Sequence, residues 1–176
     1  QHGFQINFNL NAQSQMFEIS GCDFSKTAID KCKEKYSTGT FFVHDLISDE
    51  QIYEKYDMIF MIFTLSAIDP KYHKKVFKKA YNCLNPGGKL FFKDFGQFDM
   101  VQIRYKNTNI LEKNFYKRND GTLTYFFTEE YFKNITDDFN ITEIKMDKRL
   151  LINRKRELDM YRVFLQATLQ KPFQLN

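Results

Sequence analysis

The chain has 176 residues, of which 43% are hydrophobic and 17% aromatic, so it has enough apolar surface to bury the core of one domain. Its 7 glycines and 3 prolines exclude collagen-like and low-complexity chains. The formal net charge of +4 at pH 7 suits a polyanionic partner without requiring one. The longest apolar run, residues 58–68, is shorter than the roughly 18 residues of a membrane-spanning helix, so we expect no membrane partner.

The three cysteines, Cys22, Cys32 and Cys83, lack the CxxC spacing of zinc clusters and are an odd number for a disulfide framework. They are typical of reduced thiols inside a cell, and we expect no bound metal. We therefore expect a cytoplasmic location, with the nucleus and the mitochondrion as open alternatives.

The first part of the chain alternates between short apolar runs and a helical pattern. Residues 16–22 are predicted to form a strand, and Ser25 is placed to cap a helix whose apolar residues recur at helical spacing. Gly39 is expected to end that helix, and residues 41–43 to form a second short strand.

The next segment predicts a strand, a helix and another strand. Residues 57–63 are apolar without alternation, as in strands that are buried on both faces of a parallel sheet. Pro70 marks the start of a helix, the turn at 85–88 stops it, and residues 89–95 form the following strand. Strands separated by helices indicate βαβ units, so we predict an α/β fold with a doubly wound, mostly parallel sheet.

The helix after Pro70 carries a cluster of lysines. We expect them to form one solvated face, with a nucleic-acid contact as the less favoured alternative. The cluster comprises Lys71, Lys74, Lys75, Lys78 and Lys79.

The second half of the chain has a different character. Residues 98–131 are polar and aromatic, with a hairpin-type turn at 119–122. Residues 140–152 and 160–170 alternate apolar and polar side chains, which predicts a C-terminal antiparallel strand pair. We find no domain boundary, so residues 1–176 are taken as a single domain.

Acidic residues stand where three of the predicted strands end. Ligands of a doubly wound sheet bind beyond the carboxyl ends of its strands, and Asp23, Asp45 and Asp94 lie there. The two oxygens of Asp23 could accept both hydroxyls of a ribose, and Asp45 could accept the amino group of an adenine. The alternative is that Asp23 and Asp45 only cap the segments that follow, and position alone favours neither. Apolar walls for the base would come from Phe24, Leu46 and Ile62.

The sequences of these segments resemble those of one family, the S-adenosylmethionine-dependent methyltransferases that make N3-methylcytidine in tRNA. The less specific matches are Cys22-Asp23-Phe24-Ser25 with Ala28-Ile29, Asp45-Leu46, Ile62-Phe63-Thr64-Leu65-Ser66-Ala67, Leu84-Asn85-Pro86-Gly87-Gly88 and Lys93-Asp94-Phe95-Gly96. The more specific matches are Asn114-Phe115-Tyr116-Lys117-Arg118-Asn119-Asp120-Gly121-Thr122, Tyr125-Phe126-Phe127-Thr128 and Arg162-Val163-Phe164-Leu165-Gln166.

This resemblance implies a Rossmann-like, class I methyltransferase fold with S-adenosyl-L-methionine as cofactor and tRNA as substrate. It makes Asp23 the ribose ligand, Asp45 and Leu46 the adenine contacts, and Ile62 part of the cofactor wall. The family would place a substrate-binding insertion at residues 98–131. Its candidate substrate contacts are Arg104 and Arg118 for phosphates or base edges and Tyr116 for stacking on an extruded cytidine.

The activity that the resemblance implies is methyl transfer to N3 of a cytidine in a tRNA anticodon loop, by direct in-line attack of the ring nitrogen. Asp94 is our candidate catalytic residue, in contact with the exocyclic amine of the base. The alternative for Asp94, that it orients a neighbouring backbone turn, is equally open. An accessory protein such as an aminoacyl-tRNA synthetase is a partner that the resemblance leaves open.

One expected feature is absent from the sequence ahead of Asp23. The fold needs a glycine-rich loop there, and only Gly3 and Gly21 precede Asp23, while residues 1–15 resemble the helix that should follow such a loop. We therefore expect the first strand and the glycine loop to be missing from this chain and to belong to an upstream segment. Two other functions stay open: a non-catalytic RNA-binding or regulatory module of the same fold, and a small-molecule methyltransferase.

Overall fold

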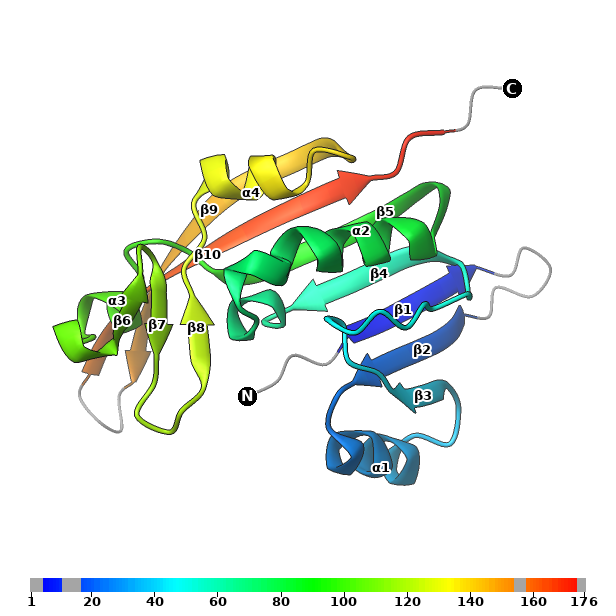
Figure 1. Cartoon of the computed structure of the whole chain (residues 1–176), viewed down its shortest axis with the longest axis horizontal. Coiled ribbons are helices and arrows are strands. Elements are labelled where there is room, and N and C mark those ends of the chain that lie inside the picture. The colour runs from blue at the N-terminus through cyan, green and yellow to red at the C-terminus, as the bar shows by residue number, and fades with distance from the viewer. Residues whose placement is uncertain (1–4, 11–16, 154–157, 174–176) are drawn as a thin grey trace.

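A seven-stranded mixed sheet crosses the molecule in the strand order β3-β2-β1-β4-β5-β10-β9 (Figure 1). The computed structural model describes residues 5–10, 17–153 and 158–173. The strands of this sheet are β1 (Gln5–Leu10), β2 (Phe17–Asp23), β3 (Thr40–Val43), β4 (Tyr56–Ile62), β5 (Leu84–Phe95), β9 (Asn140–Asn153) and β10 (Leu158–Gln170). Strand β2 is parallel to β3 and β4 is parallel to β5, whereas β10 is antiparallel to both β5 and β9.

Strand β1 corrects the prediction for the start of the chain. Residues 1–15 were expected to resemble a helix, but Gln5–Leu10 form a strand between β2 and β4, antiparallel to both. Its sequence, QINFNL, alternates polar and apolar residues with the period of a strand. Without a strand at this position, backbone N–H and C=O groups of β2 and β4 would lack partners inside the sheet. Strand β1 supplies those partners. The sheet is therefore mixed where a mostly parallel one was expected, and its central position is filled.

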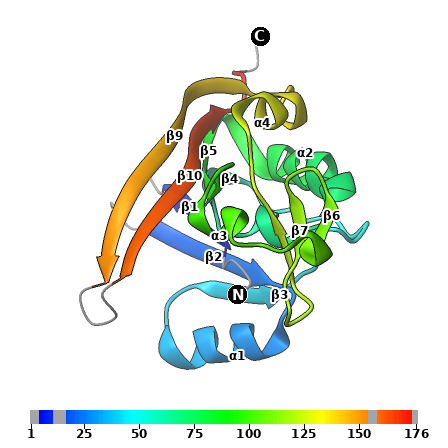
Figure 2. The same ribbon diagram turned by 90° about the vertical axis from the view of Figure 1, so that its left-hand side faces the viewer.

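Two helices lie on the same side of the sheet (Figure 2). They are α2 (His73–Cys83), which is preceded by short 3-10 turns at Leu65–Ala67 and Pro70–Tyr72, and α4 (Glu129–Ile135). A third helix, α1 (Lys26–Lys35), begins at Ser25, whose Oγ accepts a hydrogen bond of 3.3 Å from the backbone N–H of Ala28, as the sequence predicted.

The core lies between the sheet and the helices α2 and α4. Phe77 of α2 and Phe132 of α4 pack edge to face with ring centroids 5.5 Å apart, and Phe92 of β5 lies 4.7 Å from Phe132. Phe127 packs against Phe92 as well, at 5.3 Å. These rings are almost completely buried, so they supply a large share of the apolar area that holds the layers together.

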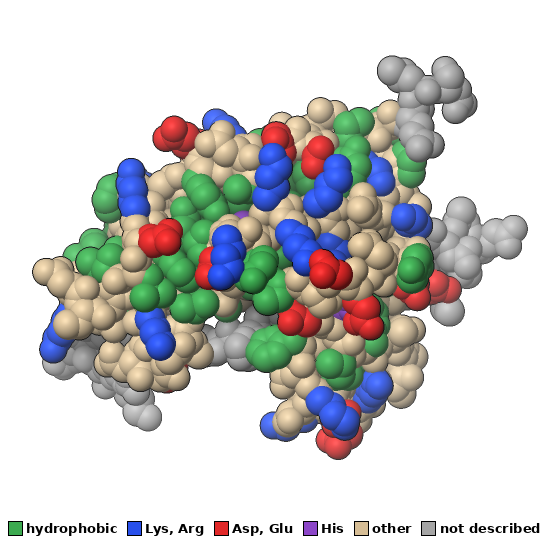
Figure 3. Space-filling view, viewed as in Figure 1, with side chains coloured by type: hydrophobic (Ala, Val, Ile, Leu, Met, Phe, Trp, Pro, Cys, Tyr) green, Lys and Arg blue, Asp and Glu red, His purple; other side chains and the backbone are tan. Residues whose placement is uncertain are grey.

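Lys71, Lys74, Lys75 and Lys78 are paired with acids. Figure 3 shows acidic and basic side chains interspersed on this face of the molecule. Lys74 pairs with Asp137 at 2.7 Å and Lys78 with Asp138 at 3.3 Å, and all four side chains are substantially exposed. Lys79 differs, because it is only 6% exposed. The prediction of a solvated lysine face therefore fails at Lys79.

The insertion at 98–131 forms a small layer of its own beside the main sheet. It contains α3 (Met100–Ile103), a 3-10 turn at Asn107–Asn109 and a three-stranded antiparallel sheet. The strands are β6 (Ile110–Glu112), β7 (Phe115–Lys117) and β8 (Leu123–Tyr125). The predicted turn at 119–122 joins β7 to β8, where Gly121 adopts a φ of +85° that favours glycine.

Candidate functional site

A cavity of about 310 Å³ opens at the carboxyl ends of β2, β3 and β4. Four of the five residues predicted from the sequence to hold a cofactor line it: Asp23, Phe24, Asp45 and Leu46. The others that line it are Cys22, His44, Ile47, Thr64, Ala67, Ile68, Asp69, Tyr72 and Leu123. We call this space the first cavity.

Asp23 combines the two roles that were weighed for it. Its Oδ1 accepts a hydrogen bond of 2.7 Å from the backbone N–H of Ser25 at the start of α1, which is a capping role. Its Oδ2 has no hydrogen-bond partner among the described residues, and the side chain lines the first cavity. One oxygen of Asp23 therefore orders the turn, and the other is available to a ligand.

Asp45 has a similar arrangement at the end of β3. Its Oδ1 accepts a hydrogen bond of 3.0 Å from the backbone N–H of Ile47, while the residue as a whole is exposed. Leu46 is half-buried beside it, and the ring of Phe24 is 53% exposed at the rim of the cavity. The pair of acidic residues with apolar neighbours has the polar and apolar surfaces that a nucleoside requires.

Ile62 does not line the first cavity, so the structure corrects this prediction. Successive side chains of a strand point to opposite faces, and Ile59 and Met61 are buried in the core beneath α2. Ile62 therefore points to the other face of the sheet. The wall that was expected from Ile62 comes instead from Thr64 and Ile68, on the turns that follow β4.

Asp94 is fully buried at the end of β5 and lines neither of the cavities described here. Its Oδ2 accepts a hydrogen bond of 2.9 Å from the backbone N–H of Ser66, and its Oδ1 accepts one of 2.9 Å from the backbone N–H of Phe95. Burial raises the pKa of Asp94 to about 6, although its hydrogen bonds oppose that rise. A contact between Asp94 and a base has no support in this geometry. The geometry matches the alternative, in which Asp94 orients the turn at Leu65–Ala67.

A second cavity of about 430 Å³ adjoins the first, and both are lined by Ala67 and Leu123. It lies between the main sheet and the insertion, and none of its lining residues is acidic. Its aromatic side is made by Phe63, Phe95 and Phe164, and its polar side by Ser66, Arg118, Thr122, Thr124 and Arg162, with Gly121 completing the lining.

The two arginines of the second cavity are held by neighbouring side chains. Arg118 Nε donates to Thr124 Oγ1 at 2.8 Å, and Arg162 Nε lies 2.8 Å from Asp99 Oδ2. Among the described residues the terminal nitrogens of both guanidinium groups have no hydrogen-bond partner. Arg118 was predicted as a substrate contact, whereas Arg162 was not, although it belongs to one of the matched segments.

The other two predicted substrate residues lie outside this cavity. Arg104 is exposed at the end of α3. The ring of Tyr116 is already stacked on Tyr105, with centroids 4.9 Å apart and planes 16° from parallel, and its hydroxyl accepts from Gln102 Nε2 at 3.3 Å. The stacking of Tyr116 on a cytidine therefore has no support here, because that face of the ring is occupied by Tyr105.

His73 supports the wall of the first cavity from behind. Its Nε2 donates to the carbonyl oxygen of Ile68 at 2.9 Å, and its Nδ1 accepts from the hydroxyl of Tyr131 at 3.0 Å. Burial lowers the pKa of His73 to about 4, so the ring is neutral near pH 7. A lone histidine at the start of a helix gives no sequence signal for such a role.

The first cavity fits the adenosine half of S-adenosyl-L-methionine. Asp23 and Asp45 each have one carboxylate oxygen without a hydrogen-bond partner among the described residues. Those oxygens and the apolar surface of Leu46 are the groups that a ribose and an adenine need. The sequence has no Gly-x-Gly motif ahead of Asp23, so the fit extends to the adenosine half alone. In the part of the chain that the structure describes, no three His, Cys, Asp or Glu side chains are grouped to hold a metal ion. No helix of that part is long and apolar enough to cross a membrane.

The chain is similar in sequence to methyltransferases of other organisms. A Drosophila melanogaster protein, tRNA N(3)-methylcytidine methyltransferase Mettl2, is 41% identical over 165 residues, which are 88% of this chain and 51% of the fly protein. The tRNA(Thr) (cytosine(32)-N(3))-methyltransferase of Saccharomyces cerevisiae is 37% identical over 174 residues, 91% of this chain and 27% of the yeast protein. The chain thus spans about half the length of the fly relative and less of the yeast one.

Solved structures and a family model point to the same fold. The crystal structure of a SAM-dependent methyltransferase from Methanosarcina mazei superposes with a TM-score of 0.69 at 20% identity, covering 88% of this chain and 82% of that one. TehB from Haemophilus influenzae gives a TM-score of 0.61 at 14% identity, covering 89% and 51%. The fold is thus the predicted Rossmann-like, class I methyltransferase fold. The family model described as a methyltransferase domain matches residues 5–145, and the chain therefore belongs to the methyltransferase domain family.

Proposed function

We propose that this chain is part of an S-adenosyl-L-methionine-dependent methyltransferase that modifies N3 of a cytidine in the anticodon loop of a tRNA. The observation that carries the proposal is the pair of adjoining cavities, which share Ala67 and Leu123. One cavity has the acidic and apolar groups for a nucleoside cofactor, and the other has aromatic rings and arginines. The names of the fly and yeast relatives support tRNA as the substrate.

In this proposal the first cavity holds the adenosine half of the cofactor. Asp23 Oδ2 accepts from the ribose hydroxyls, and Asp45 accepts from the adenine amino group. Leu46 and Phe24 cover the faces of the base. S-adenosyl-L-methionine, when bound, supplies an electrophilic methyl group on its sulfonium.

The second cavity is proposed to hold the target nucleotide. Phe63, Phe95 and Phe164 offer aromatic faces to a base that has left its stack, and Arg118 and Arg162 offer unpaired N–H donors. Methylation of N3 gives the cytosine a positive charge, so guanidinium groups against the ring would oppose the reaction. We therefore assign the two arginines to the phosphates of the target strand rather than to the base.

The proposed chemistry makes modest demands on the side chains. N3 of cytosine already has an in-plane lone pair, so no general base has to remove a proton before it attacks. The contribution of the chain is then to bind and orient the two reactants and to exclude water. The turn at Leu65–Ala67, which lies between the two cavities and is held by Asp94, is placed to set their relative position. Asp94 is a positioning residue in this scheme.

Two further features of the proposal rest on the sequence alone. A cytoplasmic location is proposed, with the nucleus and the mitochondrion as alternatives, and the requirement for an accessory protein such as an aminoacyl-tRNA synthetase stays a prediction. The alternatives of a non-catalytic RNA-binding module and a small-molecule methyltransferase are separated from the proposal by one assay.

That assay is methyl transfer from isotopically labelled S-adenosyl-L-methionine to total tRNA by the full-length protein, followed by nucleoside analysis. The proposal expects label in N3-methylcytidine. Label in a different nucleoside would overturn the choice of cytidine N3. Tight binding of tRNA without any transfer would favour the non-catalytic module, and transfer to small metabolites but not to tRNA would favour the small-molecule enzyme.

A further inference from the structure

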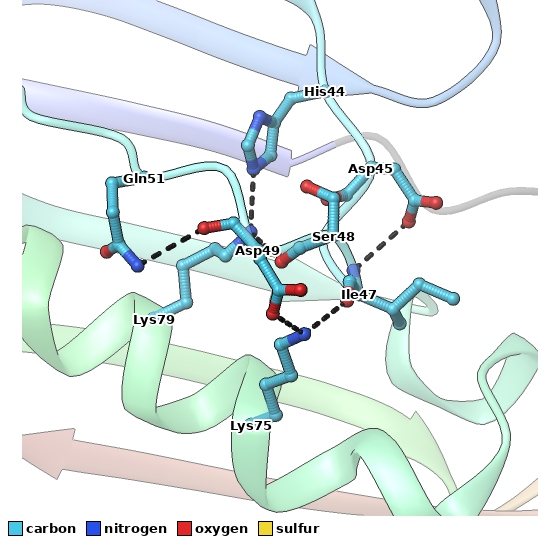
Figure 4. Close-up of polar contacts among 8 residues, drawn as sticks. All are labelled: His44, Asp45, Ile47, Ser48, Asp49, Gln51, Lys75 and Lys79. Atoms are coloured by element: carbon cyan, nitrogen blue, oxygen red, sulfur yellow. Dashed lines mark hydrogen bonds and ion pairs between the residues drawn. The ribbon is translucent and has the colours of Figure 1, made fainter.

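The segment at 44–51, between β3 and β4, forms the adenine side of the first cavity without any helix or strand of its own. We call it the adenine loop. It carries Asp45 and Leu46. Because it has no helix or strand, its conformation is held by its own turns and by contacts with other segments. Figure 4 shows that two lysines of α2, Lys75 and Lys79, reach it from below.

Lys79 makes the inner of these contacts. Its Nζ lies 2.9 Å from Nε2 of His44 and donates to the carbonyl oxygen of Ser48 at 3.0 Å. Lys79 and His44 are each only 6% exposed. A buried lysine is costly unless its N–H groups are paired, so its presence here indicates a specific role.

Burial and the contact with Lys79 together favour the neutral form of His44. Burial, followed by the charge of Lys79, lowers the pKa of His44, so the ring is neutral and its Nε2 lone pair accepts from Lys79. Burial also lowers the pKa of Lys79. His44 Nδ1 faces the carboxylate of Glu50 at 3.7 Å.

The hydrogen bonds of Lys79 lead to two of the three acidic residues that line the first cavity, Asp23 and Asp45. The backbone N–H of His44 donates to the carbonyl oxygen of Asp23 at 3.0 Å. The backbone N–H and the hydroxyl of Ser48 both donate to the carbonyl oxygen of Asp45, at 3.1 and 2.8 Å. Lys79 therefore contacts His44 and Ser48, whose own hydrogen bonds go to the backbones of Asp23 and Asp45.

Lys75 makes the outer contact with the same loop. Its Nζ donates to the carbonyl oxygen of Ile47 at 2.7 Å and pairs with Asp49 at 2.7 Å. The Lys75 side chain is 39% exposed and that of Asp49 is fully exposed, so this pair contributes much less than a buried one.

We infer that Lys79 is a positioning residue that sets the shape of the adenine side of the first cavity, and so its affinity and selectivity for an adenine nucleoside. This inference rests on the proposed function of that cavity. Lys79 does not line the cavity and acts through His44 and Ser48.

The test compares Lys79→Met with Lys74→Met in the full-length protein, using calorimetric binding of S-adenosylhomocysteine and of its hypoxanthine analogue. Lys74 is a matched control, because it lies on the same helix and pairs with Asp137 away from the adenine loop. We expect Lys79→Met to weaken S-adenosylhomocysteine binding about tenfold, as the loss of one buried hydrogen-bonded contact implies. We also expect it to narrow the preference for adenine over hypoxanthine, and we expect Lys74→Met to change neither.

Further readouts separate positioning from general loss of stability. In methyl transfer, Lys79→Met should raise the KM for S-adenosyl-L-methionine and leave kcat at saturation within about twofold, because the ribose separates the adenine of the cofactor from its reacting methyl. If Lys79→Met does not fold, Lys79→Gln, which keeps an N–H donor on the side chain, takes its place, with an expected loss of about threefold. Equal affinity and selectivity in wild type and variant would overturn the inference, whereas a wild-type protein that fails to bind S-adenosylhomocysteine would overturn the proposed function instead.

Discussion

Asp99 and Arg162 form an ion pair in which Oδ2 and Nε are 2.8 Å apart, with the aspartate side chain fully buried and the arginine 19% exposed. The same oxygen of Asp99 accepts the backbone N–H of Val163 at 2.8 Å. The guanidinium carbon of Arg162 lies 5.5 Å from the ring centroid of Phe95 and 5.2 Å from that of Phe164. The pair joins the start of the insertion to β10 and holds the guanidinium at the second cavity before any ligand arrives.

Asp99→Asn is expected to damage both stability and RNA binding. The substitution leaves Arg162 without its counter-charge and weakens the bond to Val163, so the free energy of unfolding should fall by about 3 kcal/mol, at the low end for a broken buried pair. Affinity for tRNA should fall with it. Urea denaturation and a filter-binding assay measure the two effects. Glu143→Gln is the control, because Glu143 and Lys145 form an exposed pair within β9, and it should change stability by less than about 0.5 kcal/mol. A stability loss no larger than that of the control would contradict the structural role of the pair.

Arg118→Ala should weaken tRNA binding without affecting the cofactor. Arg118 lines the second cavity and Arg104 does not, although the sequence predicted both as substrate contacts. We expect Arg118→Ala to weaken tRNA binding about tenfold. The slope of log affinity against log salt concentration should fall by the contribution of about one phosphate contact. Arg104→Ala should cost less. S-adenosylhomocysteine binding should be unchanged in both variants. If Arg118→Ala and Arg104→Ala lost the same tRNA affinity, the second cavity would not be part of the RNA-binding surface.

The predictions that succeeded depend on local patterns. The buried strand expected at 57–63 is β4 at Tyr56–Ile62, and the C-terminal pair expected at 140–152 and 160–170 is β9 and β10. Apolar runs and alternation along a strand are readable from neighbouring residues alone. The strand ends were therefore placed well enough to bring Asp23 and Asp45 to one cavity.

The predictions that failed depend on contacts between distant segments. Lys79 belongs by sequence to a lysine-rich helix face, but the adenine loop folds over it and buries it. Tyr116 has the chemistry to stack on a base, but Tyr105 from the same insertion occupies its ring. Ile62 is the last residue of β4, a buried strand without alternation, so its face could be assigned only once Met61 was seen in the core.

Asp23→Ala in the full-length protein is expected to abolish measurable cofactor binding. The variant removes the oxygen available to the ribose and also the acceptor of the Ser25 N–H. Loss of the two charge-assisted hydrogen bonds proposed between Asp23 Oδ2 and the ribose hydroxyls implies about 3 kcal/mol or more, which is over a hundredfold in affinity. Calorimetry with S-adenosylhomocysteine is the measurement. Asp30→Ala, which breaks the exposed pair with Lys26 on α1, should bind as the wild type does, and undiminished affinity in Asp23→Ala would exclude Asp23 from the site.

His73 should make the fold sensitive to mild acid. Its pKa is about 4 in the folded chain, against an ordinary value of 6.5, so the folded state favours the neutral ring. The resulting stability is fully present above pH 6.5 and is lost as the pH falls toward 4, by a total of about 3 kcal/mol. Unfolding free energies of wild type and His73→Phe, measured by urea denaturation from pH 7.5 to 4, should therefore converge as the pH falls. A difference between the two proteins that stays constant over this range would show that His73 is not held neutral.

Asp94 should affect kcat for methyl transfer, because it holds the turn at Leu65–Ala67 between the two cavities. The pKa of Asp94 is raised to about 6 from an ordinary 3.8, so the folded state favours its protonated form. The stability that this form contributes is present below pH 3.8 and is lost as the pH rises through 6. This pH dependence is opposite in sign to that of His73. Above pH 6 the carboxylate accepts the N–H groups of Ser66 and Phe95 with full charge, and the turn at Leu65–Ala67 is held most firmly.

We therefore expect kcat of the wild type to fall as the pH drops through 6, and kcat of Asp94→Asn to be lower at pH 8 and to lack that step. An asparagine offers one acceptor oxygen where the carboxylate offers two, so one of the two N–H groups is left unpaired in the buried site, at a cost of about 1–3 kcal/mol. Affinities for tRNA and S-adenosylhomocysteine should change by less than about threefold, because Asp94 lines neither cavity. A loss of tRNA affinity as large as the loss of kcat would instead indicate that Asp94 touches the base.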